Sequence, residues 1–463
     1  MSAAVRAALT AALLLGAAAC AEPAPPSPSP PASTTSRASR PAATPAPPAT
    51  PPSAAASAAP AATPEPQGPD RPLNVLLILV DSMRADMPWA GYPRDIAPNL
   101  TQLERESVSY SRAYSVSSYT AKSVAALLSG QYPSSLKRSG FFFTHYPDSN
   151  LFFPELLAQA GVHTIATHGH MYMAPGKNGM DQGFADWQVV GGIKFDNTKD
   201  DFVTSDKMTA LGISQLEAAP KGKPFFMYMH YMDPHDVYVR HPESPDFGKS
   251  SRDRYDGEIF YTDLWIGKLL DYCRQQPWWN KTAVIVSADH GEAFGEHKMY
   301  RHAFALWNAL THVPLFVHLP GGVAPRRIDT PRSDIDLAPT ILDLMGVEGD
   351  PVFAGKTLVP ELYGADAPAR PVLLDLPVDS NNPEVRAMID GTMKLIVYGR
   401  DYRFELYDLA ADPGETTDLS KRQPERLEAM KQLYRELWSK VPAIRPYGGN
   451  RLIDGSPANG PSK

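Results

Sequence analysis

The chain has few of the features that mark disulfide-rich, nucleic-acid-binding or membrane-spanning proteins. Only two cysteines, Cys20 and Cys273, occur in 463 residues, which is too few for a disulfide framework. The formal net charge of -7 argues against a nucleic-acid partner, because phosphate backbones are bound by concentrated Lys and Arg. The apolar run at residues 7–19 is too short for a stable membrane span. What remains, 43% hydrophobic and 21% charged residues, is the ordinary composition of a soluble enzyme with a large core.

The amino terminus has the pattern of an export signal. The run 7–19 ends in small residues, and Cys20 follows it. The sequence Ala-Ala-Ala-Cys resembles a bacterial lipoprotein processing site, although the first Ala stands where those sites usually have Leu. We therefore expect residues 1–19 to be a signal peptide and Cys20 to be the lipidated first residue of an exported protein of the cell envelope. Residue 21 is not Asp, which favours the outer membrane, while an ordinary export signal cleaved nearby is the alternative.

Residues 20–72 have the composition of a tether. Seventeen of the residues from 21 to 72 are proline, and none is aromatic. Such a segment cannot form a core, and proline-rich sequence is semi-extended. We expect a disordered spacer that holds a folded domain away from the membrane surface.

Two apolar runs are followed by side chains that can bind a metal ion. Residues 283–286 predict a buried parallel strand, and Asp289 and His290 follow it. Residues 74–80 predict a second buried strand, which Asp81 ends. Ligands bind at the carboxyl ends of the strands in an open α/β sheet, so these three side chains are candidate metal ligands. The alternative is a loop whose acid and imidazole cap the next helix.

Thr120 lies where a helix is predicted to begin. Residues 123–128 are helix-forming, and Gly130 is a suitable end. Free N–H groups and the helix dipole at such a position would stabilise an anionic ester. A threonine there is more often a helix cap, so the residues alone leave both the cap and the nucleophile open.

Four separated motifs together resemble the sulfatases of the alkaline phosphatase superfamily. In the order and spacing of that family, they are Asp81, the stretch 120–130, Asp289-His290-Gly291 and Val313-Pro314-Leu315. The resemblance extends from Leu73 to about Pro442. It implies an α/β fold with a central, mostly parallel sheet flanked by helices and a small antiparallel subdomain. The expected divisions are a catalytic domain over 73–370, a carboxy-terminal subdomain over 371–445 and a disordered tail over 446–463.

The chain departs from the sulfatase pattern at the nucleophile. Sulfatases normally have Cys or Ser at the head of a C-x-P-S-R motif, and this residue is converted to formylglycine. Here Thr120 is at the head, with Lys122 in place of Pro and Val124 in place of Arg. Threonine cannot become formylglycine. The resemblance therefore implies an unmodified Thr120 nucleophile.

A second departure affects the metal. Ser82 stands where sulfatases have a second Asp, and His290 stands where they usually have Asn. Asp81, Thr120, Asp289 and His290 are similar to the one-metal set of lipoteichoic acid synthases and phosphoethanolamine transferases. One carboxylate fewer and one imidazole more shift the preference for the single divalent ion toward Mn²⁺ or Zn²⁺, with Ca²⁺ as a further candidate.

Several histidines occur at other positions that the family uses. The resemblance implies that His170 and His235 contact the substrate and that His302 protonates the leaving group, since imidazole titrates near neutrality. His168 replaces a family Lys. A surface loop is the alternative for His168 and His170, and a packed structural imidazole is the alternative for His235. His230 lies within a predicted strand and is expected to be a hydrogen-bonded core residue.

The expected function is metal-dependent hydrolysis of a sulfate or phosphate ester in a small-molecule, glycan or lipid substrate. An envelope phosphotransferase is the runner-up, although such enzymes generally carry several transmembrane helices before the catalytic domain. A lipoprotein that keeps the fold as a binding module is the non-enzyme alternative. The intact set of Asp81, Thr120, Asp289 and His290 argues against this alternative, because a binding module without catalysis could lose any one of them.

Overall fold

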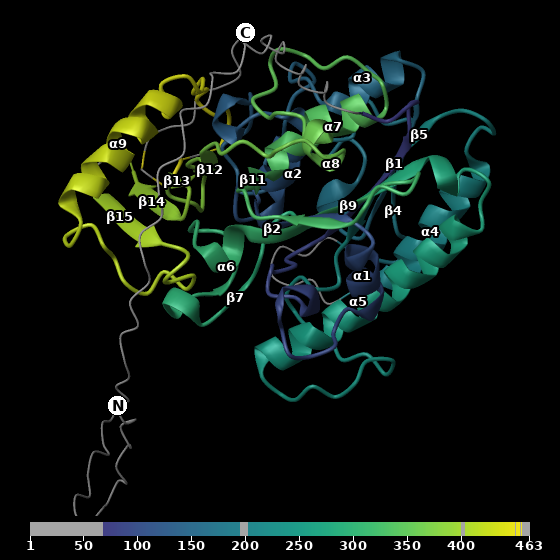
Figure 1. Cartoon of the computed structure of the whole chain (residues 1–463), viewed down its shortest axis with the longest axis horizontal. Helices are drawn as coiled ribbons and strands as arrows, with labels where there is room; N and C mark the ends of the chain where they lie inside the picture. The colour runs from purple at the N-terminus through teal and green to yellow at the C-terminus, as the bar shows by residue number, and fades with distance from the viewer. Residues whose placement is uncertain (1–67, 195–201, 400–402, 450, 454, 456–463) are drawn as a thin grey trace, which may run out of the picture. The chain divides into compact units, whose positions relative to one another are not determined.

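A computed structural model of the chain describes residues 68–194, 202–399, 403–449, 451–453 and 455 (Figure 1). The predicted signal peptide, Cys20 and nearly all of the predicted tether lie outside the described residues. None of the helices in the described ranges is long and apolar enough to cross a membrane.

The described residues are organised around a nine-stranded sheet with the strand order β10-β2-β9-β6-β1-β5-β3-β4, in which β11 also pairs with β2. The strands are β1 (Asn74–Val80), β2 (Val108–Tyr114), β3 (His163–His168), β4 (Asp186–Val189), β5 (Phe225–Tyr231), β6 (Thr282–Ser287), β9 (His312–His318), β10 (Arg326–Ile328) and β11 (Arg332–Ser333). β6, β1, β5, β3 and β4 are parallel, whereas β9 is antiparallel to β6 and to β2. The expected central, mostly parallel sheet is confirmed.

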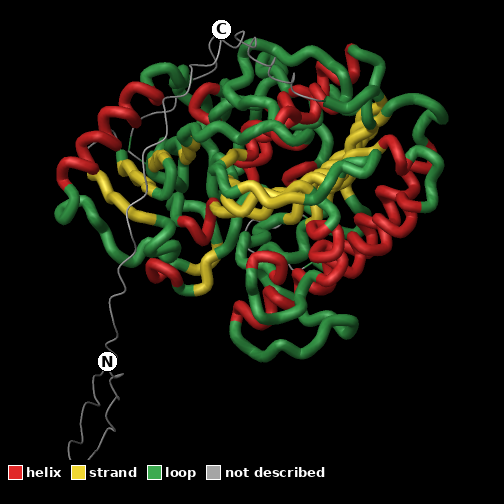
Figure 2. The backbone as a smooth tube through the Cα atoms, in the orientation of Figure 1, coloured by secondary structure: helices red, strands yellow, loops and turns green. Residues whose placement is uncertain are grey.

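Helices cover both faces of this sheet (Figures 1 and 2). They are α1 (Pro98–Arg105), α2 (Thr120–Ser129), α3 (Phe153–Gln159), α4 (Ser205–Ala218), α5 (Ser251–Arg274), α6 (Asn308–Thr311), α7 (Leu337–Leu344) and α8 (Val359–Leu362). In β1, Leu77 and Leu79 belong to the core beneath α2, α3 and α7, while Ile78 and Val80 belong to the core beneath α1, α4 and α5. Burial on both faces explains why β1 is a continuous apolar run.

The register of the central strands brings their carboxyl ends to one edge. Leu79 pairs with His230 of β5 and with Ser287 of β6. His230 pairs in turn with His168 of β3. Because side chains alternate between the two faces of a strand, these residues share the face that α2 covers. Residues two positions later can therefore approach the same point above the sheet.

A smaller antiparallel sheet follows, as expected. Its strands are β12 (Val372–Leu376), β13 (Val385–Asp390), β14 (Met393–Tyr398) and β15 (Arg403–Asp408), paired in that order. Helix α9 (Pro424–Trp438) packs Met430, Tyr434 and Trp438 against the side chains of this sheet. The boundaries expected at residues 370 and 445 stay predictions. Within the segment expected to be a tail, Tyr447 exchanges backbone hydrogen bonds with Arg138 and Gly140.

Two helices differ from what their local sequence predicts. The spacing of Leu100, Leu103 and Val108 predicts a helix through Val108, but α1 ends at Arg105 and Val108 begins β2. The pattern of residues 256–274 predicts a helix over that range, but α5 begins at Ser251, because Ser250 and Asp253 form a capping box. Cys273 is fully buried near the end of α5, as is common for a free thiol.

Candidate active site

Asp81, Asp289 and His290 meet at the carboxyl ends of β1 and β6. The Nε2 atom of His290 lies 3.4 Å from Asp289 Oδ2 and 3.8 Å from Asp81 Oδ1. All three side chains are buried, and one potential ligand atom from each lies within 4.8 Å of the others. The alternative of a loop that caps the next helix does not describe this arrangement.

The chemistry of these three groups fits a cation. Burial, and then the neighbouring Asp81 carboxylate, raise the pKa of Asp289 well above its ordinary value. Asp289 Oδ2 has no hydrogen-bond partner among the described residues. A divalent ion between the carboxylates would satisfy this oxygen and stabilise both charges.

Thr120 faces this cluster and does not cap its helix. It is the first residue of α2, while the cap position belongs to Tyr119, whose side chain makes no capping bond. The Thr120 hydroxyl donates a hydrogen bond of 3.0 Å to Asp81 Oδ2 and lies 3.3 Å from His290 Nε2. The cap hypothesis is therefore wrong for this hydroxyl.

A buried network that the sequence did not indicate fixes the start of α2. The hydroxyl of Tyr119 donates to the Asp379 carboxylate, and Lys122 Nζ lies 3.6 Å from the same carboxylate. Burial lowers the pKa of Lys122 to about 7, although Asp379 opposes that shift. Asp379 also accepts hydrogen bonds from Asn382, whose side-chain oxygen accepts one from the Phe304 N–H at 2.9 Å. The loop after β12 thus contacts both the start of α2 and the segment that follows His302.

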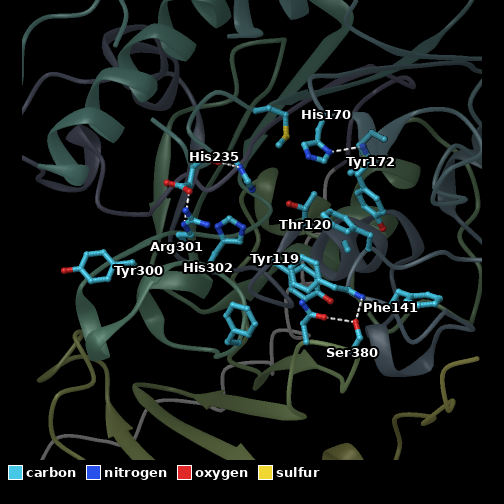
Figure 3. A pocket seen from close by; sticks show the side chains of 18 residues that line it. Tyr119, Thr120, Phe141, His170, Tyr172, His235, Tyr300, Arg301, His302 and Ser380 are labelled. Atoms are coloured by element: carbon cyan, nitrogen blue, oxygen red, sulfur yellow. Dashed lines mark hydrogen bonds and ion pairs between the residues drawn. The ribbon is translucent and has the colours of Figure 1, made fainter. Parts of the chain in front are cut away.

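The predicted substrate-contacting histidines lie around one pocket with Thr120. The pocket has a volume of about 630 Å³, and His170, His235 and His302 line it (Figure 3). The ring centroids of His235 and His302 are 4.9 Å apart, and those of His290 and His302 are 4.3 Å apart. The structure places these residues together, while their individual roles stay predictions.

Hydrogen bonds orient the three imidazoles. His170 Nδ1 accepts from the Tyr172 N–H at 2.8 Å, so the proton of the neutral ring is on Nε2. Burial lowers the pKa of His170 to about 4, which keeps this ring neutral at physiological pH. His235 Nδ1–H donates to the Asp236 carbonyl at 2.8 Å. His302 Nδ1 lies 3.3 Å from the fully buried carboxylate of Glu292.

Two further histidines, His168 and His230, are fully buried. His168 is fully buried at the end of β3, with its ring centroid 4.1 Å from that of Trp187, so the surface-loop interpretation is wrong for it. His230 is buried as expected, and its Nδ1 lies 3.1 Å from the Tyr228 hydroxyl. Its Nε2, however, lies 3.6 Å from Asp81 Oδ2 and has no hydrogen-bond partner in the described part of the chain. Knowledge that β5 pairs with β1 would have placed His230 close to Asp81.

The fold and the order of these motifs agree with a known family. The model of the family described as Sulfatase matches residues 73–347, which is more than half of the chain. The chain belongs to the sulfatase family. A second model, for the carboxy-terminal region of N-sulphoglucosamine sulphohydrolase, matches residues 295–443. The protein is a sulfatase-like hydrolase.

Two relatives show how far the likeness to other sulfatases extends. The choline-sulfatase of Rhizobium meliloti (strain 1021) is 24% identical over 429 residues, which cover 75% of this chain and 82% of that protein. Arylsulfatase K of Mus musculus is 26% identical over 249 residues, which cover 50% of this chain but only 45% of that protein.

Solved structures support the sulfatase fold. One neighbour, in complex with its substrate D-glucosamine-2-N,6-O-disulfate, has a TM-score of 0.67 at 19% identity and covers 80% of this chain and 98% of its own. The phosphonate monoester hydrolase of Silicibacter pomeroyi has a TM-score of 0.63 at 22% identity, with 79% of this chain and 94% of its own covered. At these identities the likeness shows the fold alone.

Proposed function

We propose that this sulfatase-family protein hydrolyses a sulfate or phosphate ester through the Thr120 hydroxyl, with one divalent metal ion held by Asp81, Asp289 and His290. The observation that supports the proposal most is the position of Thr120 Oγ1, which is 3.0 Å from Asp81 Oδ2 and 3.3 Å from His290 Nε2 at the edge of a pocket. A helix cap would instead direct this oxygen at backbone N–H groups.

The donor set favours Mn²⁺ or Zn²⁺ over Ca²⁺. Two carboxylates and an imidazole suit the first two ions, whereas Ca²⁺ prefers more oxygen ligands. When bound, the ion would supply positive charge that lowers the pKa of the Thr120 hydroxyl and offsets the charge of the ester.

The residues of the chain have distinct tasks in this mechanism. Asp81 orients the Thr120 hydroxyl, which loses its proton to solvent and forms a bond to sulfur or phosphorus as the bond to the leaving oxygen breaks. His170 Nε2–H donates to a non-bridging oxygen of the ester, and His235 contacts a second one. His302, oriented by Glu292, donates its proton to the leaving oxygen. Water then cleaves the Thr120 ester, with His302 as the general base.

A phosphotransferase is the second candidate, because an unmodified Thr120 ester can pass its group to an acceptor hydroxyl as well as to water. The test is a panel of an aryl sulfate, a phosphate monoester, a phosphate diester and a phosphonate ester, each with Mn²⁺, Zn²⁺ and Ca²⁺. If the protein is a hydrolase, turnover in ¹⁸O-labelled water should place one ¹⁸O atom in the released anion. Transfer to added glycerol in preference to water would favour the transferase, and no turnover of any ester would contradict both.

A further inference from the structure

Exposed aromatic side chains gather at the mouth of the Thr120 pocket. Among the described residues, six large apolar side chains are exposed, and three of them line this pocket. These are Phe141 (49% exposed), Phe304 (50%) and Tyr300 (67%). Single exposed apolar residues are common, but a group of them around a reactive hydroxyl indicates a surface for an apolar ligand.

The aromatic residues lie on opposite sides of Thr120. Phe141 lies on one side of it and Tyr300 on the other (Figure 3). Next to Phe141, the ring of Phe142 stacks on Tyr119 with a centroid distance of 4.7 Å and an interplanar angle of 9°. The Phe304 backbone N–H donates a hydrogen bond to Asn382 Oδ1. These contacts hold Phe304 and the neighbour of Phe141 in place, which reduces the entropy lost when a ring binds against them.

The charges of the pocket suit a substrate with one anionic group. Of the lining residues in the described part of the chain, Arg301 is the only fixed cation, and its guanidinium is paired with Asp236 at 2.8 Å. The three histidines can bind one tetrahedral ester. Among the described residues, no second cluster of positive charge lines the pocket for further sulfate groups, so a polysulfated glycan is a poor match.

We propose that the substrate is a sulfate or phosphate ester of an uncharged aromatic alcohol, whose ring packs against Phe141 and Phe304 while the ester group reaches Thr120. The inference rests on the proposed function for the position of the ester. It assigns the preference for the alcohol to Phe141 and Phe304, which would contact the ring edge-to-face or in an offset stack.

Binding to a Thr120→Ala variant of the full chain tests this preference without turnover. The probes are 2-naphthyl sulfate and 2-naphthyl phosphate against glucose 6-sulfate and glucose 6-phosphate, titrated calorimetrically with Mn²⁺ present. We expect the naphthyl esters to bind at least about tenfold more tightly. Phe141→Ala and Phe304→Ala should each weaken naphthyl binding by about three- to tenfold and leave the sugar esters unchanged. Val352→Ala, an exposed apolar residue outside the pocket, should change neither.

Equal or tighter binding of the sugar esters would overturn the inference. The inference would also be overturned if Phe141→Ala and Phe304→Ala weakened the binding of naphthyl esters and sugar esters equally. Failure of the proposed function would look different: the wild-type chain would turn over no ester, whatever the affinities in the Thr120→Ala background.

A second, independent observation concerns His230. Its Nε2 and Asp289 Oδ2 lie 3.7 Å apart, and both are buried without a hydrogen-bond partner among the described residues. The Ser82 hydroxyl donates a hydrogen bond to Asp81 Oδ1 at 2.8 Å, and the Ser82 N–H donates one to Asp289 Oδ1 at 3.3 Å. Ser82 therefore orients the two carboxylates, while His230 approaches them from β5.

We infer that His230 is a further ligand of the same metal ion. An Nδ1–H donated to the Tyr228 hydroxyl oxygen would direct the Nε2 lone pair toward Asp81 and Asp289, as second-shell hydrogen bonds commonly do for metal-binding imidazoles. This inference also rests on the metal site of the proposed function. Two carboxylates and two imidazoles would strengthen the preference for Zn²⁺ or Mn²⁺ over Ca²⁺.

Metal binding to the chelator-treated full chain tests this assignment apart from activity. The readouts are the Co²⁺ dissociation constant and the visible absorption spectrum of the Co²⁺ form, with circular dichroism to verify folding. His230→Gln should weaken Co²⁺ binding at least about tenfold and change the spectrum. His168→Gln, an equally buried histidine in register with His230, is the matched control and should change neither.

An unchanged Co²⁺ affinity and spectrum in folded His230→Gln would overturn the assignment. His290→Ala separates this failure from failure of the site itself. If His290→Ala loses Co²⁺ while His230→Gln retains it, only the added ligand is wrong. If both retain it, the proposed metal site is wrong as well.

Discussion

The hydroxyl of Thr120 donates a hydrogen bond of 3.0 Å to Asp81 Oδ2, although the two residues lie 39 positions apart in the sequence. This contact joins the first residue of α2 to the end of β1. Because Tyr119 and Lys122 also contact the Asp379 carboxylate, the start of α2 is held by groups from two other segments, the end of β1 and the loop after β12. Such fixed geometry is what a nucleophile needs and what a helix cap does not require.

The first prediction concerns metal content. The purified full chain should contain close to one Mn²⁺ or Zn²⁺ ion, and His290→Ala should lose it on gel filtration, since removal of an imidazole ligand weakens the binding of these ions. Elemental analysis after gel filtration is the measurement. His145→Ala, which removes an exposed imidazole, serves as the control and should keep its metal. A full complement of calcium in the wild type would contradict the prediction.

A second prediction concerns the contact between the small sheet and the segment that leads from His302 to α6. Lys394 Nζ lies 2.7 Å from Glu415 Oε1, and it also donates to the Leu306 carbonyl at 2.7 Å. Lys394→Met should lower the free energy of unfolding by about 3–5 kcal/mol, because it leaves a buried carboxylate unpaired. The double variant Lys394→Met/Glu415→Leu should lose less.

Urea unfolding measures both changes. The exposed ion pair between Lys440 and Glu436 is the control, and Lys440→Met should change stability little. A Lys394→Met protein as stable as the wild type, or a double variant less stable than the single one, would show that the buried pair does not act in this way.

The third prediction is a pH dependence. Burial lowers the pKa of His168 well below its ordinary value, so the folded protein keeps this ring neutral while the unfolded chain protonates it below about pH 6.5. The unfolded state then binds more protons, and the free energy of unfolding falls as pH falls from about 6.5. The contribution of this one group approaches about 1.4 kcal/mol per pH unit.

Chemical unfolding at a series of pH values between 7 and the acid limit of the native state checks the sign and the slope. His168→Phe keeps a ring against Trp187 but cannot be protonated, so its slope in this window should be shallower by about one proton. Identical slopes for the two proteins would contradict the prediction.

How far the sequence predicts the structure differs between elements. The bounds of β1 agree with the strand predicted over residues 74–80, because a seven-residue apolar run allows few alternatives. The amphipathic pattern of residues 424–438 likewise predicts the helix that the structure shows as α9. β2 was missed because its sequence VSYSRAY mixes polar and apolar residues without strict alternation. β12 was missed as well, and its pairing with β13 depends on tertiary contacts rather than on local pattern.

The residues of the site also differ in how well the sequence predicts that they meet. Asp81, Asp289 and His290 could be grouped from the sequence, because each follows a recognisable buried strand. The closeness of His230 could not be foreseen without knowing that β5 pairs with β1. The role of Asp379 was also hidden, since the residue follows β12 and contacts α2 only through the tertiary fold.

The fourth prediction concerns the amino terminus, which lies outside the described residues. We propose that Cys20 is lipidated and that the protein is exported and anchored in the cell envelope, on the basis of the apolar run and the tether that flank it. Cys20→Ser should move the protein from the membrane fraction to the soluble fraction. Detergent partitioning of both proteins decides this, and equal solubility of the two would exclude the anchor.

The last prediction concerns the nucleophile. Thr120→Ala should leave the protein folded and reduce kcat by about a thousandfold or more, as expected when a covalent route is removed. Thr120→Ser should keep part of the activity, since a hydroxyl remains. If Thr120 were only structural, Thr120→Ala would instead cost about 1 kcal/mol of stability and remain active.

The most direct measurement is mass spectrometry of peptides from a reaction quenched with acid during turnover. The mechanism predicts one phosphoryl or sulfuryl group on the peptide that contains Thr120, with fragment ions that place it on Thr120. Thr120→Ala should show no such adduct. An adduct on another residue, or turnover by Thr120→Ala at the wild-type rate, would contradict the assignment of Thr120 as the nucleophile.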